Sequence, residues 1–303
     1  MGINRHSWTS ANFGANVTGS EYIERTFVKA LRAKLVVAPL GRQSTMPEHQ
    51  SNTVRWQFFS NPSASASITE GADPTTGTDF TTTTAEVDLW EYGNYVDYSE
   101  YLEMVSVPAT MEELAMGEAY EAALTIDTRC TTILNAGMTS STDVGTALTA
   151  EDLRARAQAL HANSAEYHPS TPGYFAYVTN SNGWFDMAGE GAPAWFQAKD
   201  VRVQSAIDKP GSGGSANTIW DCQAILTENI PTGSSNDITW LLAKDAFGVA
   251  ALRTDVIKPR LIMTSPEQLV SAPIRNRGTI GWKAFFNAVA IDANRGEEIQ
   301  YDT

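Results

Sequence analysis

The most informative segment for the fold is residues 53–99, TVRWQFFSNPSASASITEGADPTTGTDFTTTTAEVDLWEYGNYVDYS. Its start alternates apolar and polar side chains, with Val54 and Trp56 on one side, as in a half-buried strand. Residues 85–99 predict the partner strand, because apolar residues alternate with acids and tyrosines add the bulk that strands favour. The connector, residues 61–84, is poor in apolar side chains, and compact domains rarely keep a connector longer than about 15 residues. The pattern therefore predicts a long two-stranded arm that packs on a neighbouring molecule.

Charge is segregated along the sequence. The 73 residues from Trp56 to Thr128, counted inclusively, contain no Lys, Arg or His and hold 14 of the 35 Asp and Glu. The other 21 acids equal the 21 Lys and Arg, so this segment carries the whole formal net charge of −14. The first 55 residues contain seven bases and three acids. Because protein surfaces usually mix both signs, the segregation favours contact between copies of the chain, although a solvated acidic face remains an equal alternative.

Composition bounds the class of protein. With 303 residues and 42% hydrophobic side chains, the chain can form one large domain or two ordinary ones. It lacks a signal-type apolar run at its start and any run of 18 apolar residues, so we expect a cytosolic product without membrane contact. Cys130 and Cys222 are far apart in sequence and are expected to be reduced, buried thiols. The acidic balance argues against broad nucleic-acid binding, so DNA is expected to be enclosed rather than gripped.

Three helices are predicted. Residues 20–36 have helical apolar spacing and a basic face; a core helix is the commoner reading, and a membrane-surface helix is disfavoured because acids interrupt that face. Residues 108–136 predict a rod on the order of 40 Å long, preceded by capping-box spacing. A second capping box, Thr149 with Asp152, begins the third helix.

The remaining sequence alternates short strands with loops. Residues 174–179 and 240–243 read as strands, and the loops around them, rich in Gly, Pro and Ser, match no phosphate-binding motif. Residues 278–293 predict a strand that returns to the main sheet, with Trp282 as a core anchor. This mixture of elements predicts an α+β fold.

The sequence offers little for catalysis. The four histidines have no short metal-ligand spacing, no GxSxG motif is present, and Cys130 is predicted on an apolar helix face. Glu112 and Glu113 point to different helix faces, and Glu118 with Glu121 reads as a solvated ridge. We therefore expect no enzyme, and no catalytic, metal-binding or cofactor-binding residues.

Several segments together resemble one family. They are Glu70-Gly71, LWEYGNYVDYS (89–99), the capped rod helix, KDAFGVAAL (244–252) and RNRGTIGWKAFF (275–286). In this order they resemble the major capsid proteins of tailed bacteriophages, which have the Hong Kong 97-type fold. The likeness spans roughly residues 20–300.

The resemblance implies a structural protein that self-assembles, as pentamers and hexamers, into the icosahedral head enclosing viral double-stranded DNA. It implies no cofactor, no membrane contact, a place in the virion capsid after assembly in the host cytoplasm, and portal, scaffolding and cement proteins as candidate partners. The implied parts are an N-terminal arm (1–50), an extended β-hairpin loop (51–100), a peripheral domain with a spine helix (101–170 and 272–303) and an axial domain (171–271).

Glycines in these segments have physical roles. Gly71 can adopt the positive φ of a turn, and Gly93 with Asn94 suggests a bulge or bend in a tyrosine-rich strand. Gly248 and Gly281 suggest close backbone packing. Ordinary turn chemistry is the alternative for all of them.

One departure limits what the resemblance carries over. Some relatives join subunits by an isopeptide bond from a loop lysine, and no lysine occurs between Trp56 and Thr128. We expect apolar and backbone contacts to supply most adhesion and charges to set orientation, because exposed ion pairs contribute only about 0.2 to 1 kcal/mol each. The alternatives are a tail or receptor-binding module whose Ser/Thr-rich loop recognises glycans, and a hydrolase with convergent carboxylates.

The residues expected at contacts between copies come from both charged segments and the strand between them. They are Arg25, Lys29, Arg32, Arg55, Glu70, Gly71, Asp73, Asp79, Tyr92, Glu112 and Glu118.

Overall fold

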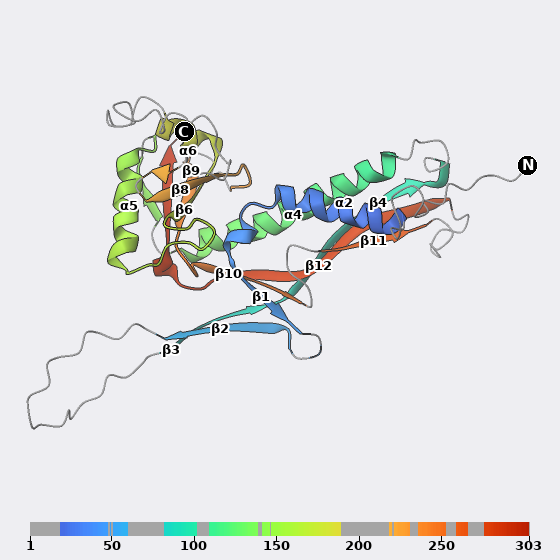
Figure 1. The fold of residues 1–303 in the computed structure, drawn as a ribbon, viewed down its shortest axis with the longest axis horizontal. Helices are drawn as coiled ribbons and strands as arrows, with labels where there is room; N and C mark the ends of the chain where they lie inside the picture. Colours follow the sequence, from blue (N-terminus) through green and yellow to red (C-terminus); the bar gives the residue numbers. More distant parts are fainter. Residues whose placement is uncertain are drawn as a thin grey trace, which may run out of the picture.

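The computed structural model describes residues 19–47, 49, 51–59, 82–101, 109–138, 141–145, 147–188, 218–219, 221–230, 236–252, 259–265 and 276–302. The molecule is elongated: a long sheet with two helices extends from a compact second sheet, and a hairpin projects to one side (Figure 1). The helices are α2 (Gly19–Lys34), η1 (Ala38–Leu40), α4 (Ala109–Gly137), α5 (Ala150–Ala162), α6 (Ser181–Ala188) and η2 (Ala293–Arg295).

Thirteen strands lie in the described part of the chain. They are β1 (Arg42–Met46), β2 (Thr53–Phe59), β3 (Thr82–Asp88), β4 (Trp90–Ser99), β5 (Ser141–Asp143), β6 (Phe175–Thr179), β7 (Thr218–Ile219), β8 (Cys222–Leu226), β9 (Asn236–Leu242), β10 (Phe247–Leu252), β11 (Arg260–Thr264), β12 (Arg277–Ala290) and β13 (Gly296–Asp302).

The long sheet is organised by β12, the returning strand that the sequence predicts. Its carboxyl half pairs with β10, and its amino half lies between β4 and β11. Strand β1 adds to β10 in parallel. Trp282 is buried as expected of a core anchor. A single 14-residue strand can hold three partners because successive stretches along its length offer separate backbone groups.

The predicted hairpin is confirmed, but its second strand is shorter than the sequence indicates. Strands β2 and β3 pair antiparallel from Thr53↔Asp88 to Phe59↔Thr82. The continuous strand predicted over residues 85–99 is wrong: the chain leaves the hairpin at Leu89, and β4 pairs instead with β12. The long edge of β12 provides backbone partners that the short β2 does not.

The predicted bulge at Gly93 and Asn94 is also wrong. Strand β4 matches β12 one residue to one over ten consecutive pairs. A Cβ atom at position 93 would lie 2.5 Å from the carbonyl oxygen of Trp282, so this glycine permits close strand approach rather than a bulge. The close backbone packing expected at Gly281 is confirmed, because a Cβ there would lie 2.5 Å from the carbonyl oxygen of Asn94. At Gly248 the close neighbours are side chains, with a ring atom of Trp56 3.0 Å from the added Cβ.

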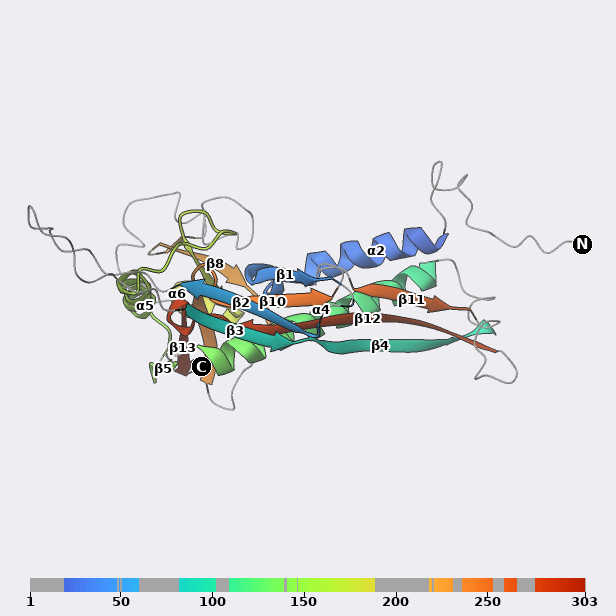
Figure 2. The same ribbon diagram turned by 90° about the horizontal axis from the view of Figure 1, so that it is seen from below.

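The predicted helices are confirmed. Helix α2 lies alongside α4, and both cover one face of the long sheet (Figures 1 and 2). The capping box at the start of α5 is present, with the Thr149 hydroxyl accepting from the Asp152 N–H. The six-stranded sheet, in the order β5-β13-β9-β6-β8-β7, packs against α5 and α6.

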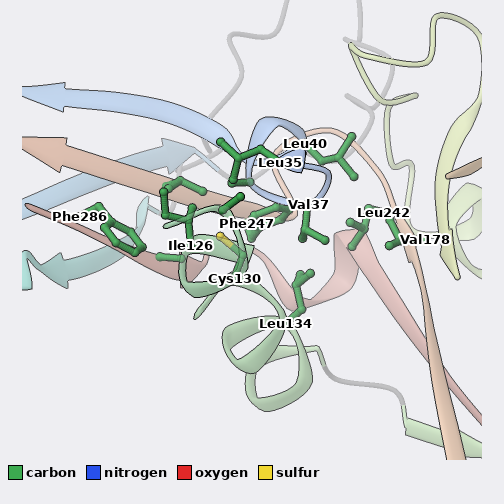
Figure 3. Close-up of a cluster of buried hydrophobic side chains, with 14 of the residues drawn as sticks. Leu35, Val37, Leu40, Ile126, Cys130, Leu134, Val178, Leu242, Phe247 and Phe286 are labelled. Atoms are coloured by element: carbon green, nitrogen blue, oxygen red, sulfur yellow. The ribbon is translucent and has the colours of Figure 1, made fainter. Parts of the chain in front are cut away.

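The main apolar core joins α2, α4 and the long sheet to the central strands β6 and β9 of the second sheet. Figure 3 shows Ile126 and Cys130 of α4 close to Phe247 and Phe286 of the long sheet. A separate cluster seats Val54 and Trp56 of the hairpin on Ala250 and Ile291. The base of the predicted arm is therefore packed on its own chain, and residues 60–81, which contain most of the predicted connector, lie outside the described residues.

Candidate functional site: surfaces for contact between chains

Helix α2 presents a basic face to the surface. Arg25, Lys29 and Arg32 are exposed and recur every three or four residues, so they share one side of the helix. Phe27 and Leu31, on the opposite side, are fully buried against α4 and the sheet. The sequence pattern thus predicted both the helix and its orientation, and the three bases can attract an anionic partner.

Arg55 differs from these bases because it has a partner within the chain. Its guanidinium lies 2.7 Å from the Glu86 carboxylate, across the hairpin between facing residues of β2 and β3. The pair is exposed, so it contributes only about 0.2 to 1 kcal/mol. It is consistent with the observed register and leaves Arg55 less available to another chain.

Two further acids of the acidic segment form ion pairs with bases of the same chain. Glu91 pairs with Lys283, and Asp97 pairs with Arg277 at 3.3 Å, in both cases across the β4–β12 ladder. The idea that the acidic segment serves only an outside partner therefore needs correction. The bases that pair with these acids lie about 180 residues further along the chain, and the sequence gives no indication of the pairing.

The structure places the other predicted interface residues in different settings. Tyr92 is half-buried, and its ring lies 4.6 Å from that of Phe286 between ring centroids. Glu112 lies half-buried in the first turn of α4, where its charge suits the helix dipole. The remaining predicted residues of the arm lie outside the described residues: Glu70, Gly71, Asp73 and Asp79.

Glu118 contradicts the predicted solvated ridge. Its side chain is on the inner face of α4 and the residue is only 3% exposed, and its Oε2 atom has no hydrogen-bond partner in the described structure. One turn on, Glu121 accepts hydrogen bonds from the Asn94 amide of β4 at 2.7 and 2.8 Å. Burial, and secondarily the Glu121 charge, raise the pKa of Glu118 to about 7.

This raised pKa predicts a pH dependence of stability. The folded chain binds the Glu118 proton more tightly than the unfolded chain does. The protonated Glu118 therefore makes its full contribution to folding stability below about pH 4.5, and this contribution is lost as the pH rises through about 7. We expect Glu118→Gln to be more stable than the wild type at pH 8 by about 1 to 2 kcal/mol and nearly equal at pH 5. Urea unfolding at both pH values measures this, and equal effects at both would contradict it.

Asp127 is a buried carboxylate that the sequence reading did not single out. Its Oδ1 and Oδ2 atoms accept hydrogen bonds from the backbone N–H groups of Val36, Val37 and Ala38 at 2.9 to 3.2 Å. Burial raises the pKa of this carboxyl, and the three N–H donors oppose that rise. The contact fixes the segment between α2 and β1 to the middle of α4. The sequence pattern did not reveal this contact because its partners lie about 90 residues apart.

His168 makes a second tie to the same segment. Its Nε2 atom lies 2.7 Å from the Leu40 carbonyl oxygen, and its Nδ1 accepts from the Ser170 N–H. Together these contacts require the neutral Nε2–H form of the ring. Burial lowers the pKa of His168, which supports the same form. The loop before β6 is thereby joined to the chain that leads into β1.

Among the described residues, no three His, Cys, Asp or Glu gather as metal ligands. Cys130 and Cys222 are free and buried as expected, and burial raises the pKa of both thiols, which disfavours the reactive thiolate. Within the same residues, no helix is long and apolar enough to cross a membrane.

One exposed feature was missed by the sequence analysis. The outer side of α4 carries Met116, Tyr120 and Leu124, which are 42%, 53% and 36% exposed and lie on successive turns. We call these three residues the α4 ridge. Their spacing of four was visible in the sequence, but the stronger apolar pattern of the inner face obscured it.

The fold is that of bacteriophage capsid proteins. The capsid protein of Ralstonia phage GP4 superposes with a TM-score of 0.67, at 12% identity over 87% of each chain. That of cyanophage Pam1 superposes with a TM-score of 0.61, at 10% identity over 99% of each chain. A virus-like particle from Pyrococcus furiosus gives a TM-score of 0.55, at 7% identity over 92% of this chain and 98% of that one.

Comparison of sequences alone does not detect the likeness to capsid proteins. No protein-family model matches the chain, and no curated protein sequence matches it significantly. The α+β fold and its likeness to capsid structures, expected from the order of the segments, are confirmed by the structure.

Proposed function

We propose that this chain is a major capsid protein that self-assembles into the icosahedral head enclosing viral double-stranded DNA. One observation carries the proposal: the capsid fold accounts for 86 to 99% of the chain in the solved structures it resembles. A fold retained over its whole length at such low identity is more readily explained by a shared architecture than by a borrowed domain.

Electron microscopy of the purified protein tests the proposal. We expect closed shells, or rings of five and six copies, on raising the concentration. A chain that stays monomeric at high concentration and binds glycans would instead favour the tail or receptor-binding module. A hydrolytic activity of the purified chain would instead favour the hydrolase with convergent carboxylates.

The proposal includes the finer organisation expected from the sequence. Residues 1–50 form an N-terminal arm, 51–100 an extended loop, 101–170 with 272–303 a peripheral domain, and 171–271 an axial domain. The hairpin β2–β3, the long α4 and the separate six-stranded sheet support parts of these kinds, but not the bounds: β5 and β13 of that sheet lie outside residues 171–271, and β10 and β11 of the long sheet lie within them. Copies form pentamers and hexamers, DNA is enclosed without sequence-specific contacts, and portal, scaffolding and cement proteins are candidate partners in the virion.

We further propose that the basic face of α2 meets acidic surface on a neighbouring copy. Arg25→Glu combined with Arg32→Glu should reduce shell formation about tenfold or more, since each reversal replaces an attraction by a repulsion at a contact repeated around the shell. The free energy of unfolding of the separate chain should change by less than about 0.5 kcal/mol, because both side chains are exposed. Particle yield and urea unfolding measure the two effects.

The matched control is Arg154→Glu with Lys244→Glu, which changes the net charge equally on α5 and in the turn after β9, where both bases pair with local acids. This control should still assemble. Equal loss of assembly in both double variants, or equal loss of folding and assembly in the first, would reject a specific role for the α2 face.

A further inference from the structure

We propose that Glu118 and Glu121 of α4, together with Asn94 of β4 and Trp282 of β12, form a proton-controlled switch that sets how firmly the middle of β4 is held against the helix. A proton on Glu118 keeps the contact closed, and its loss makes local opening more frequent while the rest of the fold stays intact. We call these four residues the α4–β4 switch. The switch acts within a single chain, so it goes beyond the proposed function and does not depend on it.

The four side chains come from one layer, between α4 and the long sheet. The Asn94 side-chain amide donates to both carboxylate oxygens of Glu121, at 2.7 and 2.8 Å. Asn94 and Trp282 are opposite each other in the β4–β12 ladder, so their side chains point to the same side of the sheet. Glu118 lies one turn before Glu121 and is almost fully buried. Two carboxyl groups of one helix therefore lie above the same pair of strands.

Two buried polar atoms of the switch have no hydrogen-bond partner within the described structure. They are Oε2 of Glu118 and Nε1 of Trp282. A buried carboxylate oxygen without a donor is costly when the group is charged, and much less so when the group carries a proton. The position of Glu118 thus favours its neutral form. Burial, and secondarily the Glu121 charge, raise the pKa of Glu118 to about 7, which has the same cause.

The two helices supply no cation to Glu118 among the described residues. The one charge that shifts its pKa is that of Glu121. The side chains three and four positions away on α4 are Leu114, Ala115, Glu121 and Ala122. The buried side of α2 carries Phe27 and Leu31. The charged residues of α2 that are exposed are Glu24, Arg25, Lys29, Arg32 and Lys34.

The long sheet also presents uncharged side chains to α4 at this level. Asn94 contacts α4, so the strand alternation and the register define the residues on the same side of the sheet. They are Tyr92, Val96 and Tyr98 of β4, Ile280, Trp282 and Ala284 of β12, and Leu261 and Met263 of β11. The titratable groups among them are two phenols, and tyrosine is ordinarily uncharged near pH 7. The bases Arg260, Arg277 and Lys283 point to the opposite side.

The fold is weakest against local opening at the same place. Gly117 precedes Glu118 in the interior of α4, and no packing neighbour lies within 4 Å of a Cβ atom built on it, so nothing stiffens the helix there. Strand β4 pairs with β12 alone among the described strands and lies at the edge of the long sheet (Figure 2). It can move away from α4 without breaking a second ladder.

The sign of the effect follows from proton binding. The closed contact binds the Glu118 proton more tightly than an opened one, in which the carboxyl returns to its ordinary pKa of about 4.5. Opening is therefore rarest below about pH 4.5, becomes more frequent as the pH rises to about 7, and is constant above that. Outside this window Glu118 has the same protonation state in both forms.

Hydrogen–deuterium exchange of the unassembled, full-length chain tests the inference. Peptides from β4, read by mass spectrometry, should lose protection about tenfold or more between pH 5 and pH 8, after correction for the intrinsic exchange rate. At pH 8, urea well below the unfolding midpoint should change exchange in β4 by less than about twofold, whereas exchange in β9 should follow unfolding of the whole chain. No loss in β4, or the same urea dependence in both strands, overturns the inference.

Variants assign the effect to the carboxyl pair. Glu118→Gln keeps the shape without the charge, so its β4 peptides should retain at pH 8 the protection that the wild type has at pH 5. Glu121→Gln removes the like charge and should reduce the loss. Glu113→Gln is the matched control, since it makes the same change at an exposed position of α4 and should follow the wild type. Equal pH dependence in Glu118→Gln and the wild type overturns the inference, and the urea comparison and Glu121→Gln test it even if Glu118→Gln folds poorly.

Discussion

Asp127→Ala is expected to lower the free energy of unfolding by about 3 to 5 kcal/mol, because it leaves three backbone N–H groups without acceptors in a buried site. Asp127 is fully buried and accepts from Val36, Val37 and Ala38. Urea unfolding of the unassembled chain measures the loss. Since the segment connects α2 to β1 and the hairpin, the variant should also lower the yield of assembled particles.

Asp292→Ala is the matched control for this prediction. Its carboxylate accepts one backbone hydrogen bond, from the Asn294 N–H at 3.0 Å, and one from the Arg295 guanidinium at 3.1 Å, at a half-buried site before η2. Its loss should cost about 1 kcal/mol. If Asp127→Ala costs no more than Asp292→Ala, the segment after α2 is held by apolar packing alone, and the role assigned to Asp127 is wrong.

Gly281→Ala is expected to destabilise the chain by about 3 kcal/mol through overpacking. A Cβ atom at position 281 would lie 2.5 Å from the carbonyl oxygen of Asn94 and 2.6 Å from the Cβ of Tyr95. The nearest obstacle is backbone, so β4 and β12 must separate for the methyl group to fit. Thermal or urea unfolding measures the effect, which should also broaden the amide signals of both strands.

Gly117→Ala is the same chemical change, but it is expected to raise the free energy of unfolding rather than lower it. The site is in a helix, is exposed and has open space around the added carbon. This variant should therefore stabilise the separate chain by about 0.5 to 1 kcal/mol. Two Gly→Ala changes with effects of the same sign would show that the cost at position 281 does not arise from the close approach of the two strands.

Much of the fold could be predicted from local patterns. The apolar spacing of residues 108–136 and the capping box at Thr149 predicted α4 and α5, because helix periodicity and capping depend on neighbours within one turn. The alternation around Trp56 predicted β2, because strand alternation also depends only on residues close together in the sequence. The buried thiol of Cys130 followed from its place on the inner face of a helix.

The candidate interface was predictable only in part. The exposed bases of α2 follow from helical spacing alone, so Arg25, Lys29 and Arg32 were identified correctly as surface residues. Glu118 was placed wrongly, since the side of α4 on which it lies becomes buried only when the sheet packs there. The α4 ridge was overlooked because two apolar faces on one helix give overlapping patterns.

Local sequence patterns predict the main elements, their order, the segregated charge and the likeness to capsid proteins, because each depends on residues close together along the chain. Only the packing of the whole chain brings β4 from the hairpin to β12, pairs Glu91 and Asp97 with bases of β12, and lets Asp127 hold the segment after α2. These pairings join residues about 90 to 190 positions apart, and their free energy is realised only when the long sheet and α4 come together, so no local pattern records them.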